Sequence, residues 1–552
     1  MMKLPEDAFK HLDIAFVMDK IATHTPYGAA LKKQMKPHSS EELESLQEEL
    51  SAVAQVAELL EANRYGFIDL RNQFKRVKDL KGTFARIWGK EVLSVTELFE
   101  VKSLAMAMQK IETVSKKIEA SSFKSSGKFP ESACVVALPE VERLLDPSRT
   151  GIETFYIYDD YSEELHQLRT QMKQLEDEIG IDRKRQRLRL ESQLEIRIRP
   201  NGELTVSKDD LILMERIGGS DAFIYSAETY MNTTFKMRQS EQVGEWLCAL
   251  EGLRYEEEET EFAVRKQLSR ELGQWVDVLE ENALRIGKLD LLVAKSAFAV
   301  GYHCVRPEFA KNGGIYIEEG RHIKVEAQLK TDSRTFEPIS IKIEEGVTCI
   351  TGANMGGKTV TLKLLGMLVA MAQYGLFVPV KSMKLSPRSF IYTSIGDLQN
   401  IDQGLSTFGA EIVKVRDAVK IAKLGGLILI DELARGTNPS EGYAISKAII
   451  HFLKKQPSMT VITTHFDGLA DEDDVKHLQV MGLSGANFDQ IMLEMENDPE
   501  RGLALLHESM DYKLKEIHHP EEVPKDAIHI AKLMGLDEEI LEEAKRVLCK
   551  LK

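Results

Sequence analysis

One short segment, residues 347–364 (VTCITGANMGGKTVTLKL), restricts the folds open to this chain more than any other. It starts as an apolar run of β-favouring residues, continues into a glycine-rich loop, and ends in leucines at helical spacing. The loop, Gly352 to Thr359, fits the pattern G-x-x-x-x-G-K-S/T. This order of strand, loop and helix favours a phosphate loop over the alternative, a glycine-rich turn with a solvent-exposed lysine. The segment therefore predicts an α/β domain with a phosphate-binding loop.

The residue types in this loop indicate its chemistry. Glycines allow backbone N–H groups to converge on phosphate oxygens at the N-terminus of a helix. Lys358 is expected to reach the β- and γ-phosphates, and the hydroxyl of Thr359 is expected to ligate Mg²⁺. The expected ligands are therefore ATP and Mg²⁺, and the expected ATP-binding residues are Gly352, Ala353, Asn354, Met355, Gly356, Gly357, Lys358 and Thr359.

Two further apolar runs end in residues that suit the same chemistry. Residues 427–430 (LILI) precede Asp431 and Glu432, roughly 70 residues after the phosphate loop. A buried strand in this position delivers an aspartate to Mg²⁺, and the adjacent glutamate can orient or deprotonate the attacking water. A third run ends at His465, which we expect to sense the γ-phosphate, although a single histidine at a strand end also suits a structural role. The predicted activity is ATP hydrolysis.

The composition narrows the class of protein that carries this loop. A chain of 552 residues is too long for one core, so about two to four domains are expected. Five scattered cysteines without a CxxC pair indicate a reducing compartment, with neither disulfides nor a zinc site. No apolar run approaches the ~18 residues of a membrane span, and the N-terminal residues lack the apolar core of an export signal. A cytoplasmic protein without a membrane partner is expected.

Long helices are expected on both sides of a small tip. Residues 161–195 carry apolar side chains at alternating three- and four-residue spacing, which is typical of a helix that packs along another helix. Residues 240–303 contain no proline and again suit helix. Between them, Pro200-Asn201-Gly202 separates two alternating runs, IRIR and ELTV, and predicts a β-hairpin. The two helical stretches are therefore expected to run out to a small β element and return.

The end of the first of these helices is the most basic part of an acidic chain, whose net charge is −16. Such a run is either a solvated helix face or a contact to the phosphate backbone of a nucleic acid, which needs charge but no sequence readout. The overall negative charge argues against an extensive DNA-binding face, but it does not exclude a local basic patch such as this one. The candidate DNA contacts are Arg183, Lys184, Arg185, Arg187, Arg189, Arg197 and Arg199.

From about residue 305 the pattern changes from helical spacing to alternation of apolar and polar residues. Pro307 and Gly313-Gly314 mark the change. Alternation of this kind is typical of strands, and it predicts strand positions for Ile315, Ile317, Ile323, Val325, Ile339, Ile341 and Ile343.

Taken together, these motifs resemble those of the MutS family. TGANMGGKT is similar to that family's phosphate-loop pattern TGPNMGGK-S/T, with Ala353 in place of the proline. IGDLQNIDQGLSTF and IDELARGTNPSEG are most similar to the bacterial branch that ends in an Smr nuclease domain. The resemblance spans the chain from about residue 5 to the end and is densest over residues 305–470.

The resemblance implies a mixed fold: an all-α lever arm with a small clamp tip, plus an α/β P-loop ATPase domain of the ABC/MutS type. It also implies a homodimer through the ATPase domain, with composite nucleotide sites. The expected domains are residues 1–155, the first half of the lever; 156–240, the clamp and coiled-coil-like arm; 241–304, the second half of the lever; and 305–552, the ATPase domain with a helix-turn-helix at about 527–548.

The resemblance further implies roles for single residues. Ser406, which by itself would suit an ordinary helix N-cap, would act in trans on the γ-phosphate bound by the partner. Phe336 would pack near the adenine. Asp431 would share Mg²⁺ with Thr359, while Glu432 would act as the catalytic base and His465 as the sensor.

The sequence departs from the family pattern at both ends, and two functions stay open. We find neither the N-terminal mismatch-recognition domain with its Phe-x-Glu wedge nor the Smr domain, so nuclease activity is not expected. The first function is a dimeric, ATP-switched clamp on duplex, mismatched or branched DNA, linked to DNA repair or recombination. The second is an ATP-dependent remodelling chaperone, or reactivase, for a protein client such as a cobalamin-dependent aminomutase.

Overall fold

The chain divides into two compact units. The first unit comprises Met1–Lys75, Ile111–Cys134 and Leu284–Lys552, and the second comprises Arg76–Lys110 and Val135–Ala283. The structure is a computed structural model, and it describes residues 2–121, 127–152, 154–352, 357–396, 407–434, 437–466, 468–470, 474–483, 487–497, 501, 505, 509–517, 528, 531–532 and 536–551.

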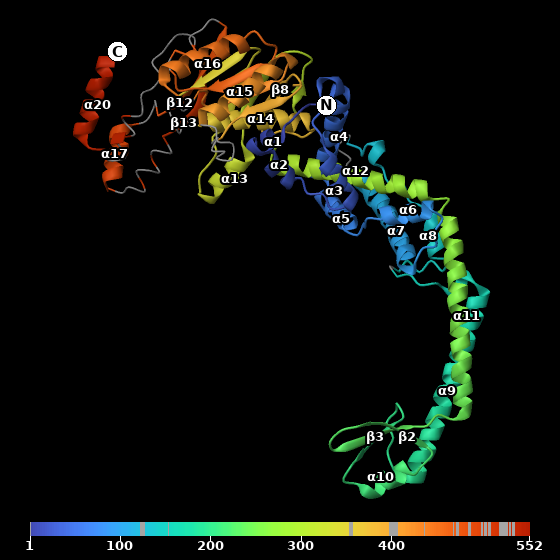
Figure 1. Cartoon of the computed structure of the whole chain (residues 1–552). Helices are drawn as coiled ribbons and strands as arrows, with labels where there is room; N and C mark the ends of the chain where they lie inside the picture. The colour runs from blue at the N-terminus through green and yellow to red at the C-terminus, as the bar shows by residue number, and fades with distance from the viewer. Residues whose placement is uncertain are drawn as a thin grey trace. The chain divides into compact units, whose positions relative to one another are not determined.

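A six-stranded sheet forms the centre of the first unit (Figure 1). Its strand order is β13-β12-β7-β11-β10-β9, and every neighbouring pair is parallel except β12 and β13. The strands are β7 (Val347–Thr351), β9 (Ile391–Ser394), β10 (Leu427–Ile430), β11 (Met459–Thr463), β12 (Val475–Gly482) and β13 (Asp511–Glu516). Side chains of β7, β10 and β11 are buried on both faces, as expected for parallel strands covered by helices.

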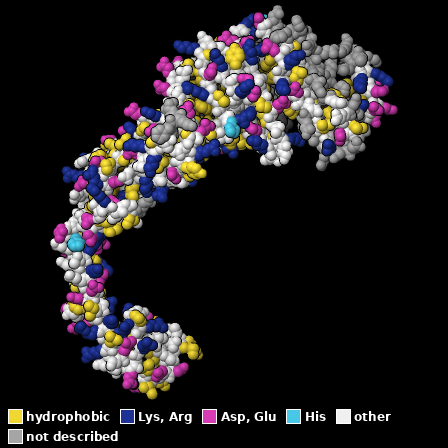
Figure 2. All heavy atoms as spheres, turned by 180° about the vertical axis from the view of Figure 1, so that it is seen from behind, with side chains coloured by type: hydrophobic (Ala, Val, Ile, Leu, Met, Phe, Trp, Pro, Cys, Tyr) yellow, Lys and Arg dark blue, Asp and Glu magenta, His cyan; other side chains and the backbone are white. Residues whose placement is uncertain are grey.

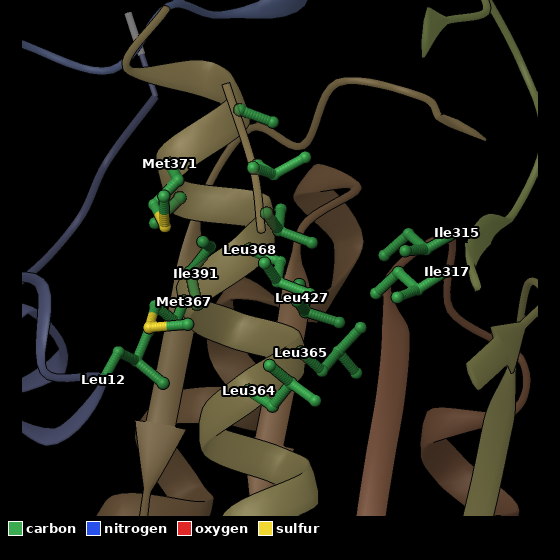
Figure 3. Close-up of a cluster of buried hydrophobic side chains, with 14 of the residues drawn as sticks. Leu12, Ile315, Ile317, Leu364, Leu365, Met367, Leu368, Met371, Ile391 and Leu427 are labelled. Atoms are coloured by element: carbon green, nitrogen blue, oxygen red, sulfur yellow. The ribbon is translucent and has the colours of Figure 1, made fainter. Parts of the chain in front are cut away.

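Two apolar cores cover the opposite faces of this sheet. On one face, α14 (Lys358–Gln373) packs with Leu427 and Leu429, and Figure 3 shows its Leu364, Leu365, Met367, Leu368 and Met371 in this core. On the other face, Ile428 and Ile430 pack with α15 (Thr407–Ile421) and α16 (Pro439–Leu453). Alternate residues of β10 therefore pack into opposite cores, and this alternation fixes the register of the strand.

A second sheet extends the first unit. Its strand order is β4-β8-β5-β6, with β4 (Glu308–Phe309), β5 (Ile315–Gly320), β6 (Ile339–Ile343) and β8 (Ser382–Leu385). The predicted strand positions of Ile315, Ile317, Ile339, Ile341 and Ile343 are confirmed. The prediction was wrong for Ile323 and Val325, which lie on the helix α13 (Ile323–Thr331). Two apolar residues spaced two apart do not distinguish a short strand from the first turn of a helix.

Helices make up most of the remaining chain. The first unit also holds α1 (Glu6–His11), α2 (Ile14–Lys20), α3 (Pro26–Gln34), α4 (Leu43–Ala62), α5 (Arg64–Phe74), α17 (Phe488–Asn497) and α20 (Glu538–Leu551). The second unit holds α6 (Lys81–Trp88), α8 (Pro139–Leu145), α9 (Glu163–Leu194), α10 (Leu211–Gly218) and α11 (Glu241–Leu272). Two helices, α7 (Val95–Ser121) and α12 (Val276–Gly301), have residues in both units. None of the helices described here is long and apolar enough to cross a membrane.

In the second unit, α9 and α11 lie side by side and run in opposite directions (Figure 1). Arg169 on α9 binds Glu257 and Glu261 on α11 at 2.7 and 2.6 Å. The hydroxyl of Ser240, which caps α11, donates to Asp182 of α9 at 3.2 Å. The ion pairs and the cap join the two helices at points 13 residues apart on α9.

A small antiparallel sheet lies between α9 and α11 in the sequence. Its strand order is β1-β3-β2, with β1 (Glu203–Ser207), β2 (Phe223–Glu228) and β3 (Asn232–Met237). The predicted hairpin at Pro200-Asn201-Gly202 was wrong in its pairing, because β1 pairs with β3 and residues 196–199 form no strand. The chain does turn there, with the N–H of Gly202 donating to the carbonyl of Arg199 at 2.9 Å. Ile198 is instead buried in the small core under the sheet, so the residues before the turn pack rather than pair.

Candidate nucleotide-binding site

The predicted phosphate loop follows β7, at the carboxyl end of the parallel strands. This edge is where ligands bind in open α/β sheets. Gly352 and Gly357 have positive φ angles of 132° and 82°. A Cβ on Gly352 would lie 3.0 Å from the carbonyl oxygen of Val480, and one on Gly357 would lie 3.0 Å from the ring of Tyr512. Both positions therefore require glycine. Ala353, Asn354, Met355 and Gly356 lie outside the described residues.

Lys358 begins α14, and its side chain is almost fully buried. Its ammonium group donates to the carbonyl oxygen of Gly352 at 2.5 Å and lies 3.2 Å from Nδ1 of His465. Burial lowers the pKa of Lys358 to about 8, against the opposing effect of Glu432 and Asp431. The side chain is thus a cation held at the loop with little water around it, which strengthens its attraction to a phosphate.

Thr359 and Asp431 place two oxygen atoms against each other. The Thr359 hydroxyl donates to Oδ2 of Asp431 at 2.8 Å, and the Thr463 hydroxyl donates to Oδ1 of the same carboxylate at 2.6 Å. The backbone N–H of Asp431 donates to the carbonyl of Ser394 at 2.9 Å, which holds the end of β10 against β9. A hydroxyl and a carboxylate oxygen are ligands that suit Mg²⁺ when substrate phosphates and water complete its shell. No cluster of three His, Cys, Asp or Glu side chains suited to a metal occurs within the described part of the chain.

Glu432 and His465 form a second pair at the same edge. His465 Nε2 lies 2.6 Å from Oε1 of Glu432, and its Nδ1 faces the Lys358 ammonium. Because an ammonium group only donates, Nδ1 accepts, and Nε2 carries the proton that it donates to Glu432. Glu432 has a φ of 54°, a rare conformation for a residue other than glycine, and its N–H donates to Thr463 Oγ1 at 2.9 Å. Thr463 thereby fixes both acidic residues.

Most of the residues predicted for the site come together here. Gly352, Gly357, Lys358, Thr359, Asp431, Glu432 and His465 share one edge of the sheet, linked by the contacts above. Phe336 packs against the core that includes α14, and its contact with adenine stays a prediction. Ser406 lies outside the described residues. The seven basic candidates belong to the second unit, and the structure gives them no place in this site.

Two residues of the site were not anticipated from the sequence. Thr463 ends β11, the strand between β7 and β10, and lies two residues before His465 in VITTH, so the strand end that indicates His465 also indicates Thr463. Tyr512 on β13 lies beside Gly357, and a pattern read along the chain offers no sign of that contact.

Comparisons with known proteins identify one family model and several relatives. The family model described as MutS domain V matches residues 348–552. An "Endonuclease MutS2" from Geobacillus is 28% identical over 492 residues, which is 87% of this chain and 56% of that protein. A "DNA mismatch repair protein MutS" from Streptococcus sanguinis is 32% identical over 325 residues, 57% of this chain and 36% of that protein. An "Endonuclease MutS2" from Acetivibrio thermocellus is 37% identical over 206 residues, 37% of this chain and 25% of that protein.

The chain thus spans between a quarter and just over half of the length of these relatives. The family-model match covers the phosphate loop and the strands that carry Asp431, Glu432 and His465. Residues 348–552 are thus similar to MutS domain V, and the matches to proteins named MutS and MutS2 support membership of the MutS family.

Proposed function

We propose that this chain is an ATPase that uses nucleotide binding to control a grip on DNA. The contact between Thr359 and Asp431 carries the proposal, since it joins the phosphate loop to the acidic strand end through two oxygens that suit Mg²⁺. Mg²⁺ would neutralise charge on the bound phosphates. Lys358 would bind the β- and γ-phosphates through its buried ammonium group, which lies against the loop at Gly352.

Glu432 would act on the attacking water, and His465 would contact the γ-phosphate. Glu432 would orient this water and accept its proton, because its carboxylate lies beside the loop and is partly exposed. His465 bridges Glu432 and Lys358, so a γ-phosphate that binds Lys358 would also contact this imidazole. Thr463 would act as a positioning residue through its bonds to Asp431 and Glu432. Ser406 would complete the site of a partner copy in a homodimer.

The DNA part of the proposal is supported by charge in the second unit. Residues 183–240 carry eleven Lys and Arg against eight Asp and Glu, although the whole chain has a net charge of −16. Six of the seven basic candidates on and after α9 are exposed, and Arg187 is partly buried. No described carboxylate forms an ion pair with any of the seven side chains. Unpaired cations of this kind suit a phosphate backbone, and one relative is named a DNA mismatch repair protein.

One observation favours a protein client as the second candidate. Leu211, Ile212, Tyr230 and Met231 are large apolar side chains that are mostly exposed in the small body formed by β1, β2, β3 and α10. Figure 2 shows hydrophobic side chains at the surface of this body. Apolar patches with a polar rim are typical of sites that bind proteins.

Steady-state ATP hydrolysis tests both candidates. We would measure turnover with and without duplex, mismatched and four-way-junction DNA, at low salt and at ~150 mM salt. The proposal predicts that DNA changes turnover and that the effect weakens as salt rises, because salt competes for the phosphates. Turnover that no DNA changes would contradict the DNA role and favour a protein client. An absence of turnover would contradict the ATPase itself.

A further inference from the structure

The turn that follows β10 holds two residues in an uncommon backbone conformation. Glu432 has a φ of 54° and Ala434 has a φ of 63°, both in the left-handed region that residues with a side chain seldom adopt. Leu433, between them, is buried together with Ala434. A turn of this kind persists where its surroundings hold it in place. The contacts of the turn therefore determine where the carboxylate of Glu432 lies.

Three backbone N–H groups of this turn donate to three different elements. Those of Asp431 and Glu432 donate to the ends of β9 and β11, as described above. The N–H of Ala434 donates to Oε1 of Glu411, a residue of α15 whose side chain is 4% exposed. The turn is thus bound to two neighbouring strands at its start and to a helix at its end.

The contact with Glu411 has no close substitute among the described residues. The helix α16 contributes a longer contact, in which Oγ of Ser446 lies 3.5 Å from the carbonyl oxygen of Leu433. A buried N–H that loses its acceptor is costly, because no water replaces the lost partner. Without Glu411, the N–H of Ala434 would therefore favour another backbone conformation, and the turn would move with it.

We propose that Glu411 is a positioning residue for ATP hydrolysis, which holds the left-handed turn through Ala434 and so orients the carboxylate of Glu432 toward the attacking water. The inference rests on the proposed function, in which Glu432 accepts a proton from this water. Glu411 itself lies behind the turn and acts through the backbone, so it affects the rate of hydrolysis rather than the binding of ATP.

Two substitutions separate the hydrogen bond from the bulk of the side chain. Glu411→Gln keeps an acceptor oxygen for the N–H of Ala434, whereas Glu411→Met keeps the length of the side chain and removes the acceptor. We expect Glu411→Met to lower kcat by about 10- to 100-fold, because a small misplacement of a catalytic group has an effect of this size. Glu411→Gln should keep nearly the native kcat. The affinity for a fluorescent ATP analogue should be unchanged in both variants, which places the loss in the chemical step.

Gln373→Met is the matched control for the loss of a buried acceptor. Oε1 of Gln373, a side chain without exposure at the end of α14, accepts the backbone N–H of Arg388 at 2.9 Å. Both methionine variants should lose stability, which urea unfolding measures, but only Glu411→Met should lose kcat. If Glu411→Met does not fold, Glu411→Asp takes its place, because it withdraws the carboxylate from Ala434 by one methylene group. Native kcat in the folded variant, or an equal loss in Glu411→Gln, would overturn the proposal.

Amide hydrogen exchange tests the contact without ATP hydrolysis. The N–H of Ala434 should exchange slowly in the native protein and in Glu411→Gln, and faster in Glu411→Met. Unchanged exchange in Glu411→Met would remove this inference and leave the proposed function intact. A native protein that hydrolyses no ATP would instead remove the proposed function, and the exchange rates would still show whether Glu411 holds the turn.

Discussion

The hydroxyl of Thr359 donates a 2.8 Å hydrogen bond to the carboxylate of Asp431, which lies 72 residues later in the chain. The two residues follow strands that are not neighbours, because β11 lies between β7 and β10. Thr463 at the end of β11 fills this gap and bonds the same carboxylate. The ends of β10 and β11 and the start of α14 thus meet at one carboxylate, an arrangement that suits the magnesium nucleotide proposed above.

Asp431→Asn should separate nucleotide binding from magnesium use. The amide keeps the size of the side chain but loses the charge that we propose binds Mg²⁺, so we expect the hydrolysis rate to fall at least ~100-fold. Mg²⁺ titrations of steady-state turnover measure the effect. The control is Asp417→Asn, which changes a half-buried aspartate on α15 that pairs with Arg416 and Lys420. Unchanged turnover and unchanged Mg²⁺ dependence in Asp431→Asn would refute the assignment.

Glu432→Gln should keep ATP binding and lose turnover. Removal of a general base lowers rates by about 10²–10⁴-fold, while the amide can still bond His465. Nucleotide binding by a fluorescent ATP analogue and single-turnover hydrolysis distinguish the two effects. Glu441→Gln on α16 is the matched control for a glutamate outside the site. A variant that hydrolyses ATP at the normal rate would show that Glu432 is not the base.

Lys358→Ala should weaken ATP binding itself. The ammonium group is buried against Gly352 and His465, and nothing else described at this edge supplies a cation to the phosphates. Loss of a charged hydrogen bond in a site with little water lowers affinity by about 10-fold or more. Equilibrium binding of ATP without Mg²⁺ measures the lysine separately from the metal. Normal affinity would contradict its role, and the exposed Lys420→Ala variant is the control.

The strands and the acidic pair could be predicted from sequence because parallel strands buried on both faces leave unbroken apolar runs. LILI before Asp431 is such a run, and VTCIT before Gly352 is another. Thr463 and Tyr512 were missed because their roles depend on neighbours across the sheet, which spacing along the chain does not contain. The error at Ile323 has a related cause, since two apolar residues suit the buried side of a helix as well as a strand.

The pairing error at Asn201-Gly202 shows a further limit of local reasoning. The turn residues were identified correctly, but the partner of β1 is β3, nearly thirty residues later, and is set by the small core beneath the sheet. Local turn chemistry indicates where a chain reverses, and packing decides which strands then meet.

Replacing Arg185 and Arg189 with alanine should weaken DNA binding without changing basal ATP hydrolysis. Both side chains are exposed on α9, and no described carboxylate neutralises either one. Each phosphate contact that is lost should reduce the slope of log affinity against log salt by about 0.9. DNA affinity measured at several salt concentrations gives this slope. Arg254→Ala, an exposed arginine on α11 that pairs with Glu176, should leave the slope unchanged. An unaltered slope in the double variant would place the DNA contact elsewhere.

The buried His322 should make the folded state sensitive to acid. Its side chain has no exposure, and neither ring nitrogen has a hydrogen-bond partner among the described residues. Burial lowers its pKa to about 4, although Asp13, with Oδ2 3.7 Å from Nε2, acts in the opposite direction. The neutral ring is therefore favoured in the folded state, and its contribution to stability is complete above the unfolded pKa of about 6.5 and is lost as the pH falls towards 4.

His322→Phe removes this proton-binding group and should make the free energy of unfolding less dependent on pH. Between pH 7 and pH 4 the native protein should lose about 3 kcal/mol more unfolding free energy than the variant, because a shift of about 2.5 pKa units corresponds to that difference. Urea unfolding at a series of pH values measures it. His451→Phe changes an exposed histidine on α16 and should follow the native curve. If the two proteins lose stability in parallel, His322 is protonated in the folded state as easily as in the unfolded chain, and its burial has no energetic effect on folding.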